Sequence, residues 1–421
     1  MVAATKPRDG IDLELAGRGR SLIAWAERRM PALAEFKRAL ERERPLSGLR
    51  ISGSLHLTSE TAALARCLQA GGAAVTLSGS NPLSTRDEIC ASLAADDGIS
   101  VFAYYGEDRD TYYEHLRAAA AVRPHIVLDD GADLIAHLAA GGTESDVVGI
   151  EQTTTGVQRL RALERAGRLP FPVIALNDAP LKQEFDNPYG TGQNTFDGIL
   201  RATNILIAGK TVVIAGYGWA GRGVAARARG LGANVIVTEV APVPALHAYY
   251  DGFRVLPMAE ALTLADVVIT ATGCRDVVGA AHFDSIKDGA VLANSGHFDV
   301  EIDVAALRRS ATDQIAIRPN LTEYRLPNGR RVYLLAEGRL VGQAAAEASP
   351  ADIMDLTFTL MAVTVEWVAR ERSTVTERRV ILPPAEFTER VAAMKLAALG
   401  VTHDRLTRSQ GEYVSSWSAG T

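Results

Sequence analysis

The 421-residue sequence predicts an α/β protein with two doubly wound parallel sheets and a C-terminal helical segment. Two observations carry this prediction. Short apolar runs alternate with helical patterns in two successive series, as in strand–helix–strand units of a parallel sheet. A glycine-rich turn, GYGWAG, separates the first strand of the second series from its helix. We expect domains at residues 1–190 and 191–350, and helices that return to the first domain at 351–421.

The first series begins after a charged lead-in. Residues 1–45 suggest one amphipathic helix, whose apolar side carries Leu22, Ile23, Trp25, Met30, Leu33 and Phe36. Strands are expected at Leu49–Ile51, Ala74–Leu77, Ser100–Ala103, His125–Leu128, Val147–Ile150 and Pro172–Ala175. Helices between them are expected from Ser59 and at Thr85–Ala95, Thr111–Ala121 and Val157–Arg165.

Polar residues follow several of these strands. They are His56, Asp130, the run Glu151–Thr155 and Asn177. Ligands of such sheets bind beyond the carboxyl ends of the strands, so these side chains should face one crevice. One such residue alone would more often be a helix cap or an ordinary loop residue. Four at successive strand ends favour a site.

A linker at residues 178–209 joins the two series and carries Lys182, Asp186 and Asn187 before a helix at Thr195–Ala208. The second series has strands at Val212–Ala215, Asn234–Thr238, Val267–Thr270, Ala290–Ala293 and Val332–Leu335. A long helix at Ala351–Ala369 is apolar on most faces and should cross back to the first domain.

The glycine turn has the form of a dinucleotide fingerprint. Gly216 allows the tight turn, Gly218 lets the backbone approach a pyrophosphate, and Gly221 lets the helix pack close to the strand. Glu239 ends the next strand, where an acid should meet the adenosine ribose hydroxyls. No Arg follows Glu239, which favours NAD over NADP. Both domains are therefore expected to be Rossmann-like.

The composition narrows the class of protein. The chain is 47% hydrophobic and 22% charged, with a net charge of −6, which argues against nucleic acid or an anionic membrane as partner. Cys67, Cys90 and Cys274 have no metal-ligand spacing, so we expect reduced thiols and no metal. The N-terminus has no apolar signal core, and no apolar run could span a membrane. We expect a cytoplasmic protein.

Several longer motifs resemble the S-adenosylhomocysteine hydrolase family, in collinear order from about Leu49 onward. These motifs are NPLST (81–85), DDGADL (129–134), TTTGV (153–157), FDNPYGTG (185–192), GYGWAGRG (216–223), GHFDVEID (296–303) and LLAEGRL (334–340). The GYGWAGRG spelling resembles the archaeal and thermophilic bacterial branch.

The resemblance implies a cycle in which NAD stays bound, and it implies a homotetramer. The 3′-hydroxyl of an adenine nucleoside is oxidised, a base removes the 4′ proton, and the 5′ substituent leaves by β-elimination. In the hydrolase, water then adds to the 5′ carbon and the ketone is reduced again.

The resemblance also implies residue roles. Lys182 would serve 3′ oxidation, since a desolvated lysine beside a positive ring can act as a base. Asp186 would bind ribose hydroxyls, and His56, Asp130 and His297 would handle the leaving group and water. The expected substrate-binding residues are Thr58, Glu60 (to adenine), Gln152, Thr153, Asn177, Met354 and Phe358. The expected NAD-binding residues are Thr153, Thr154, Thr155, Asn187, Gly216, Gly218, Trp219, Ala220, Gly221, Glu239, Thr272, Gly273, Ser295 and Gly296.

The sequence departs from the family mainly around the substrate. The second acid before TTTG is Gln152, the Gly-His-Pro gate is Ala348-Ser349-Pro350, and the Asn-Leu after EGRLV is Gly342-Gln343. Ser80 replaces a Cys, and Ala241 and Pro244 replace polar residues near the NAD-ribose acid.

Two enzymatic interpretations remain open. The departures favour a specialised paralogue that dehydrates a modified adenine nucleoside to an exocyclic alkene, as in angustmycin-type nucleosides. The alternative is ordinary hydrolysis of S-adenosylhomocysteine to adenosine and homocysteine. A regulatory protein that binds NAD without turnover is a third, non-enzymatic interpretation, which the intact acid–base residues oppose.

Overall fold

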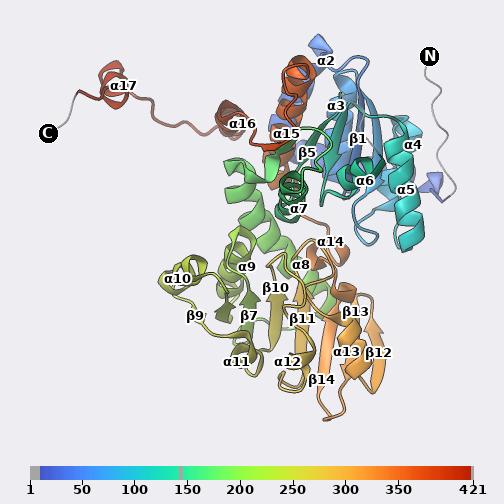
Figure 1. Cartoon of the computed structure of the whole chain (residues 1–421), viewed down its shortest axis with the longest axis vertical. Coiled ribbons are helices and arrows are strands. Elements are labelled where there is room, and N and C mark those ends of the chain that lie inside the picture. The colour runs from blue at the N-terminus through green and yellow to red at the C-terminus, as the bar shows by residue number, and fades with distance from the viewer. Residues whose placement is uncertain (1–9, 142–145, 419–421) are drawn as a thin grey trace.

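The computed structural model describes residues 10–141 and 146–418, and two α/β lobes form most of it (Figure 1). Each lobe holds one doubly wound, largely parallel sheet with helices on its faces, and helices form the C-terminal part of the chain. The fold class predicted from the sequence is therefore confirmed. Residues 1–9, 142–145 and 419–421 of the predicted domain ranges lie outside the described residues.

The first sheet has seven parallel strands in the order β15-β6-β5-β4-β1-β2-β3. Its strands are β1 (Arg50–Leu55), β2 (Ala74–Gly79), β3 (Ser100–Phe102), β4 (Ile126–Asp129), β5 (Val148–Glu151), β6 (Val173–Ala175) and β15 (Val380–Ile381). The helices between them are α3 (Ser59–Ala70), α4 (Asp87–Asp96), α5 (Arg109–Ala121), α6 (Asp133–Gly141) and α7 (Thr154–Arg165). The strand order reverses between β1 and β4, so the crevice of this sheet opens there.

The second sheet has eight strands in the order β12-β13-β14-β11-β10-β7-β8-β9. They are β7 (Thr211–Ala215), β8 (Asn234–Thr238), β9 (Arg254–Val255), β10 (Val267–Thr270), β11 (Ala290–Asn294), β12 (Asp313–Arg318), β13 (Leu321–Arg325) and β14 (Arg331–Leu335). Its helices are α9 (Trp219–Gly230), α10 (Pro242–Tyr250), α11 (Met258–Leu262), α12 (Ala280–Phe283), α13 (Val304–Ser310) and α14 (Val341–Ala344). Here the order reverses between β7 and β10. The antiparallel strands β12 and β13 are absent from the sequence prediction. β12 is mostly exposed, and β13 is mostly buried but carries polar residues among its apolar ones, so neither has the apolar run of a buried parallel strand.

The single N-terminal helix predicted from the sequence is wrong. A short 3₁₀ turn, η1 (Leu13–Leu15), precedes two helices, α1 (Ala16–Arg29) and α2 (Pro31–Glu43). Pro31 has no backbone N–H and restricts Met30, so the chain breaks there and a new helix starts. Of the predicted apolar side, Leu22 and Trp25 are exposed, at 37% and 64%.

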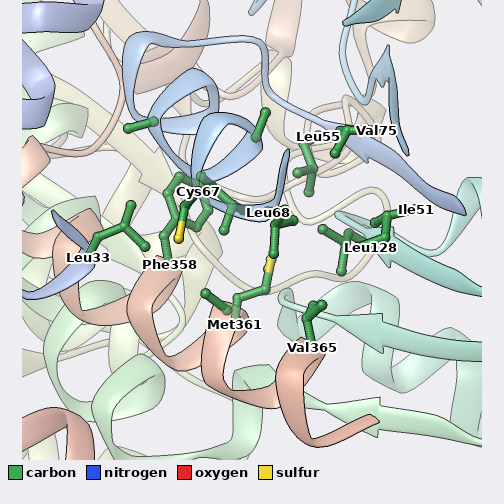
Figure 2. Close-up of a cluster of buried hydrophobic side chains, with 14 of the residues drawn as sticks. Leu33, Ile51, Leu55, Cys67, Leu68, Val75, Leu128, Phe358, Met361 and Val365 are labelled. Carbon is green, nitrogen blue, oxygen red and sulfur yellow. The ribbon is translucent and has the colours of Figure 1, made fainter. Parts of the chain in front are cut away.

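The C-terminal part returns to the first lobe. Helix α15 (Ala351–Glu371) packs on α2 and α3, where Phe358, Met361 and Val365 meet side chains from both α3 and the sheet (Figure 2). Asp355 is fully buried and accepts hydrogen bonds from the backbone N–H groups of Ala32 and Leu33 and from Lys395.

After α15 the chain adds β15 to the first sheet and continues into α16 (Ala385–Ala398) and α17 (Arg408–Ser415). The last of these lies away from the body of the molecule (Figure 1). None of the described helices is long and apolar enough to cross a membrane.

Candidate active site

One cavity of about 1130 Å³ lies between the two lobes, at the carboxyl ends of both sheets. Its walls come from the loops after β1, β4 and β5 on one side and after β7, β10 and β11 on the other. All the predicted site residues line it except Glu60 and Gly221. Glu60 lies buried in the first turn of α3, and Gly221 lies beneath the fingerprint turn.

Two histidines and an aspartate meet across the cavity. His56 follows β1, Asp130 follows β4, and His297 comes from the other lobe after β11. His56 Nε2 lies 3.5 Å from one Asp130 oxygen, and His297 Nδ1 lies 3.4 Å from the other. The ligand atoms of this group lie within 4.8 Å of one another, which would also suit a small cation.

The protonation states in this group differ because of burial and charge. Burial lowers the pKa of His56 to about 4. His297 and Lys182 lower it further, and Asp130 partly opposes them by raising it. Burial alone would raise the pKa of Asp130, but its contacts with His56 and His297, the Gln152 amide, which donates to it at 2.7 Å, and the charge of Lys182 hold that pKa below its usual value. A neutral imidazole therefore faces an ionised carboxylate at pH 7.

Gly131 makes the approach of His297 possible. Its φ of +110° is open to glycine, and a Cβ at this position would lie 2.3 Å from His297 Nε2. The carboxyl end of β4 thus meets the second lobe without a side chain between them.

A second polar group surrounds Lys182. The π-helix η3 (Leu181–Gly190) places both the fourth and the fifth following residue against it. Lys182 Nζ donates to Asp186 at 2.5 Å and to Asn187 at 3.2 Å. Thr357 of α15 also donates to Asp186, at 2.9 Å, and Asn187 donates to Asn177, at 3.2 Å. The ammonium group is thereby fixed at the cavity wall, with 12% of its side chain exposed.

Two further acids are buried behind the cavity. Burial raises the pKa of Asp129 and that of Glu151, and the nearby carboxyls add to the effect. Glu151 accepts from Gly131 N and from the N–H and hydroxyl of Thr153, so it holds the two loops together. These acids shape the loops, while Asp130 carries the charge at the cavity.

The second lobe has a backbone suited to a dinucleotide. Gly216 has a φ of +93°, and a Cβ on Gly221 would lie 2.1 Å from the Gly216 carbonyl oxygen. Gly218 precedes the first turn of α9, whose free N–H groups can bind phosphate. Glu239 accepts from the N–H groups of Tyr217, Val240 and Ala241, which fixes its carboxylate at the end of β8. These features fit NAD, with Glu239 placed for a ribose.

Comparison with known proteins agrees with this geometry. Residues 10–150 match the model described as "S-adenosyl-L-homocysteine hydrolase", and residues 187–348 match its "NAD binding domain". The chain is 53% identical to the adenosylhomocysteinase of Aquifex aeolicus, over 97% of this chain and 99% of the relative. It is 52% identical to that of Sulfurisphaera tokodaii, with the same coverage.

The chain belongs to the S-adenosyl-L-homocysteine hydrolase family. It is thus an NAD-dependent enzyme, and the cofactor predicted from the glycine turn is confirmed. Another relative, 50% identical over 97% of both chains, is named S-inosyl-L-homocysteine hydrolase, from Methanopyrus kandleri.

Three polar residues of this hydrolase-family site are absent from the site predicted from the sequence, and two of them, Asn194 and Glu301, are buried. Glu301 accepts from the backbone N–H and hydroxyl of Thr272 and from Gly273 N, so it orients a loop of the cavity. Asn194 and Gln343 line the cavity, each with a side-chain oxygen that has no partner among the described residues. Asn194 directly precedes the helix predicted from Thr195 and gave no sign of a site. Gln343 was seen only as a departure from the family.

Proposed function

We propose that this protein hydrolyses S-adenosylhomocysteine to adenosine and homocysteine. The observation that carries the proposal is one cavity that holds a complete acid–base set from both lobes: Lys182 and Asp186 on one side, and His56, Asp130 and His297 on the other. Relatives of nearly the same length that bear the name adenosylhomocysteinase support it.

Bound NAD supplies reversible oxidation of the 3′ carbon, which acidifies the neighbouring 4′ C–H. Lys182 serves as the base at the 3′ hydroxyl oxygen, and its contacts with Asp186 and Asn187 hold its nitrogen in place. Asp186, fixed by Thr357, accepts hydrogen bonds from ribose hydroxyls.

His56, Asp130 and His297 serve proton transfer at the 5′ position. The neutral imidazole of His56 can accept a proton from water, and ionised Asp130 stabilises the imidazolium that results. His297 reaches the same carboxylate from the other lobe, so this group is complete only while the lobes are together.

Glu60 favours adenine over hypoxanthine as the base. A carboxyl oxygen accepts from the exocyclic amine of adenine, whereas the keto oxygen of hypoxanthine offers no such donor. Glu60 is buried beside the cavity residue Thr58, with its carboxyl 3.1 Å from the Ser59 hydroxyl. We therefore group the chain with the relatives named adenosylhomocysteinase rather than with the one named S-inosyl-L-homocysteine hydrolase.

The dehydration predicted from the departures finds no support among the relatives, whose names are those of hydrolases. Two of the departing residues also have local partners in the site. Gln152 donates to Asp130, and Ser349 accepts from Asn194. Hydrolysis is therefore the better supported of the two interpretations.

The test is release of free thiol from S-adenosylhomocysteine by the purified holoenzyme, with S-inosylhomocysteine as the matched substrate. We expect thiol from the first and much less from the second. Absence of thiol from both, together with an alkene product from an adenine nucleoside, would overturn hydrolysis in favour of dehydration. Equal rates would overturn the assignment of Glu60, and a Glu60→Gln variant would then show no change in preference.

We infer that the active form is a homotetramer of soluble chains. The support is the projecting C-terminal segment, which exposes more than half of Leu406, Tyr413, Val414 and Trp417. Light scattering should give a mass four times that of one chain, and a monomeric active enzyme would contradict the inference.

A further inference from the structure

We propose that Asn194, together with Gln343, binds the carboxamide of the nicotinamide and thereby orients its ring. The inference rests on the NAD cofactor and is independent of which nucleoside reacts. It concerns two acceptors of this chain, on α8 (Thr191–Thr203) and α14, where these helices pack together.

Asn194 is buried and yet incompletely bonded. It is 3% exposed and lines the cavity, and its amide nitrogen donates to Ser349 at 3.1 Å. Its Oδ1 atom is buried and has no hydrogen-bond partner among the described residues. A buried acceptor without a donor costs free energy, so such an oxygen in a ligand cavity indicates a ligand N–H or O–H.

Gly342 provides the space that this amide occupies. A Cβ at Gly342 would lie 2.1 Å from Asn194 Oδ1. The oxygen therefore rests against the backbone of α14, one residue from Gln343, whose Oε1 is also buried and without a partner among the described residues. Two amide oxygens that each lack a donor thus lie at one helix contact in the cavity wall.

The position within the cavity indicates which part of NAD reaches them. The fingerprint turn and Glu239, which line the cavity, would hold the adenosine end. Next to Asn194, the Thr195 hydroxyl lies 2.8 Å from that of Ser295, two residues before His297. The pair of acceptors is therefore at the end of the cavity where the acid–base residues lie, which is where the nicotinamide must react.

The chemistry of the ring completes the argument. Its carboxamide NH₂ is the only hydrogen-bond donor of the nicotinamide, and it has two N–H groups. Asn194 Oδ1 and Gln343 Oε1 are two acceptors without donors. Binding of one NH₂ by both would fix the rotation of the carboxamide and present one face of the ring to the nucleoside.

The test compares NAD with 3-acetylpyridine adenine dinucleotide, in which a methyl group replaces the NH₂. Full-length holoenzyme is exchanged against an equimolar mixture of the two, and the bound ratio is measured by mass spectrometry. We expect the wild type to retain NAD over the analogue by about five- to tenfold, the worth of one to two hydrogen bonds. A wild-type ratio near one would overturn the proposal without any variant.

Two variants locate the effect. Asn194→Ala removes one acceptor, and Gly342→Ala pushes the Asn194 amide away, so each should lower the ratio at least about threefold. The double variant should lower the bound ratio no further than Asn194→Ala alone, because Gly342→Ala acts through the Asn194 amide. Gln193→Ala, on the same helix but outside the cavity lining, should leave the ratio unchanged. An unchanged ratio in Asn194→Ala would overturn the proposal.

The ratio of NAD to analogue is measured on the dinucleotide that remains bound. Partial unfolding of a variant therefore lowers the amount of bound dinucleotide but does not change the ratio. The measurement also needs no nucleoside. If thiol release fails while the ratio behaves as expected, the proposed reaction is wrong and the role of Asn194 stands.

Discussion

His56 shows how position sets the chemistry of one residue. It follows a strand whose last five residues are buried, so its imidazole is desolvated, and its Nδ1 lies 2.6 Å from the Ser84 hydroxyl. The pKa of His56 is consequently near 4 in the folded protein, against 6.5 for an exposed histidine. This residue stays neutral throughout the physiological range and can act there as a base.

A stability measurement can check that lowered pKa. Between pH 6.5 and 4 the unfolded chain binds a proton at His56 that the folded protein does not bind, so the free energy of unfolding falls as the pH falls. His56 accounts for a decrease in the free energy of unfolding of about 3 kcal/mol at most, and this decrease is complete near pH 4. Urea unfolding of wild type and His56→Gln at pH 7 and 4.5 should show a smaller loss in the variant. Parallel losses would contradict the lowered pKa.

Lys182→Ala should abolish oxidation of the nucleoside while NAD stays bound. Loss of a general base reduces rates by about 10²- to 10⁴-fold. Among the described residues, the Lys182 ammonium donates hydrogen bonds to Asp186 and Asn187, both in the same helix. The measurement is absorbance of reduced nicotinamide after adenosine is added, with cofactor content determined in parallel. Lys287→Ala is the control, because Lys287 pairs with Asp266 outside the cavity. Normal reduction in Lys182→Ala would exclude Lys182 as the base.

At the residue scale, sequence reasoning found the groups that stand at strand ends, because the end of a parallel strand fixes the location of the next side chain. His56, Asp130 and Glu239 are of this kind. It could not find Asn194 or Glu301, because their roles depend on contacts across the fold. Glu60, which the resemblance assigns to adenine, is buried in the first turn of α3 and is not among the residues that line the cavity.

The turn after β4 shows that the geometry of an element, too, depends on contacts across the fold. Gly131 has a positive φ, and the next residue, Ala132, has a φ of +64°, a conformation that costs a residue with a Cβ about 1 kcal/mol. This strained turn lets α6 start directly behind Asp130 and leaves the approach to His297 open.

Gly131→Ala should therefore misplace His297 and lower turnover about 100-fold, with NAD still bound. Steady-state rates and cofactor content are the measurements. Gly141→Ala is a matched control, because a Cβ there meets nothing within 4 Å. Activity near that of the wild type in Gly131→Ala would show that the close contact with His297 is not needed for turnover.

Elements with a clear apolar period were predictable, and those shaped by special backbone geometry were not. The strands β8 and β10 begin and end at the predicted residues. The π-helix η3 had no signal in the sequence, because its wider turn comes from packing around Pro188 and Gly190 rather than from propensity. The spacing of Lys182 and Asp186 was nevertheless sufficient to predict that they meet.

For the whole molecule, the contact between the lobes is the feature that unites the site. Besides His297 and Asp130, it includes Arg159 of α7, whose guanidinium lies 5.2 Å from the ring centre of Phe298 in the other lobe. Arg159 is oriented by the Gly131 carbonyl and by Asp133, at 2.7 Å. The same arginine thus holds the β4 turn and the loop that carries His297.

Arg159→Leu should weaken this association of the lobes and raise the KM for nucleoside about tenfold, with a smaller change in kcat. Arg161→Leu is the control, since Arg161 pairs with Asp178 within the first lobe at 2.6 Å. Steady-state kinetics would give the constants, and small-angle scattering would report a larger radius for the Arg159 variant. A KM equal to that of the control would rule out Arg159 as an interlobe contact of consequence.

The path of the chain through the two lobes has a consequence for its synthesis on the ribosome. The first core contains side chains from residues 23–181 and again from 351–391, and the edge strand β15 follows residue 379. A nascent chain of 350 residues therefore holds a finished nucleotide-binding lobe and an unfinished partner, with apolar surface of α2 and α3 still uncovered. Chaperone demand should peak in that interval, and truncation before residue 391 should yield insoluble protein although every predicted catalytic residue is present.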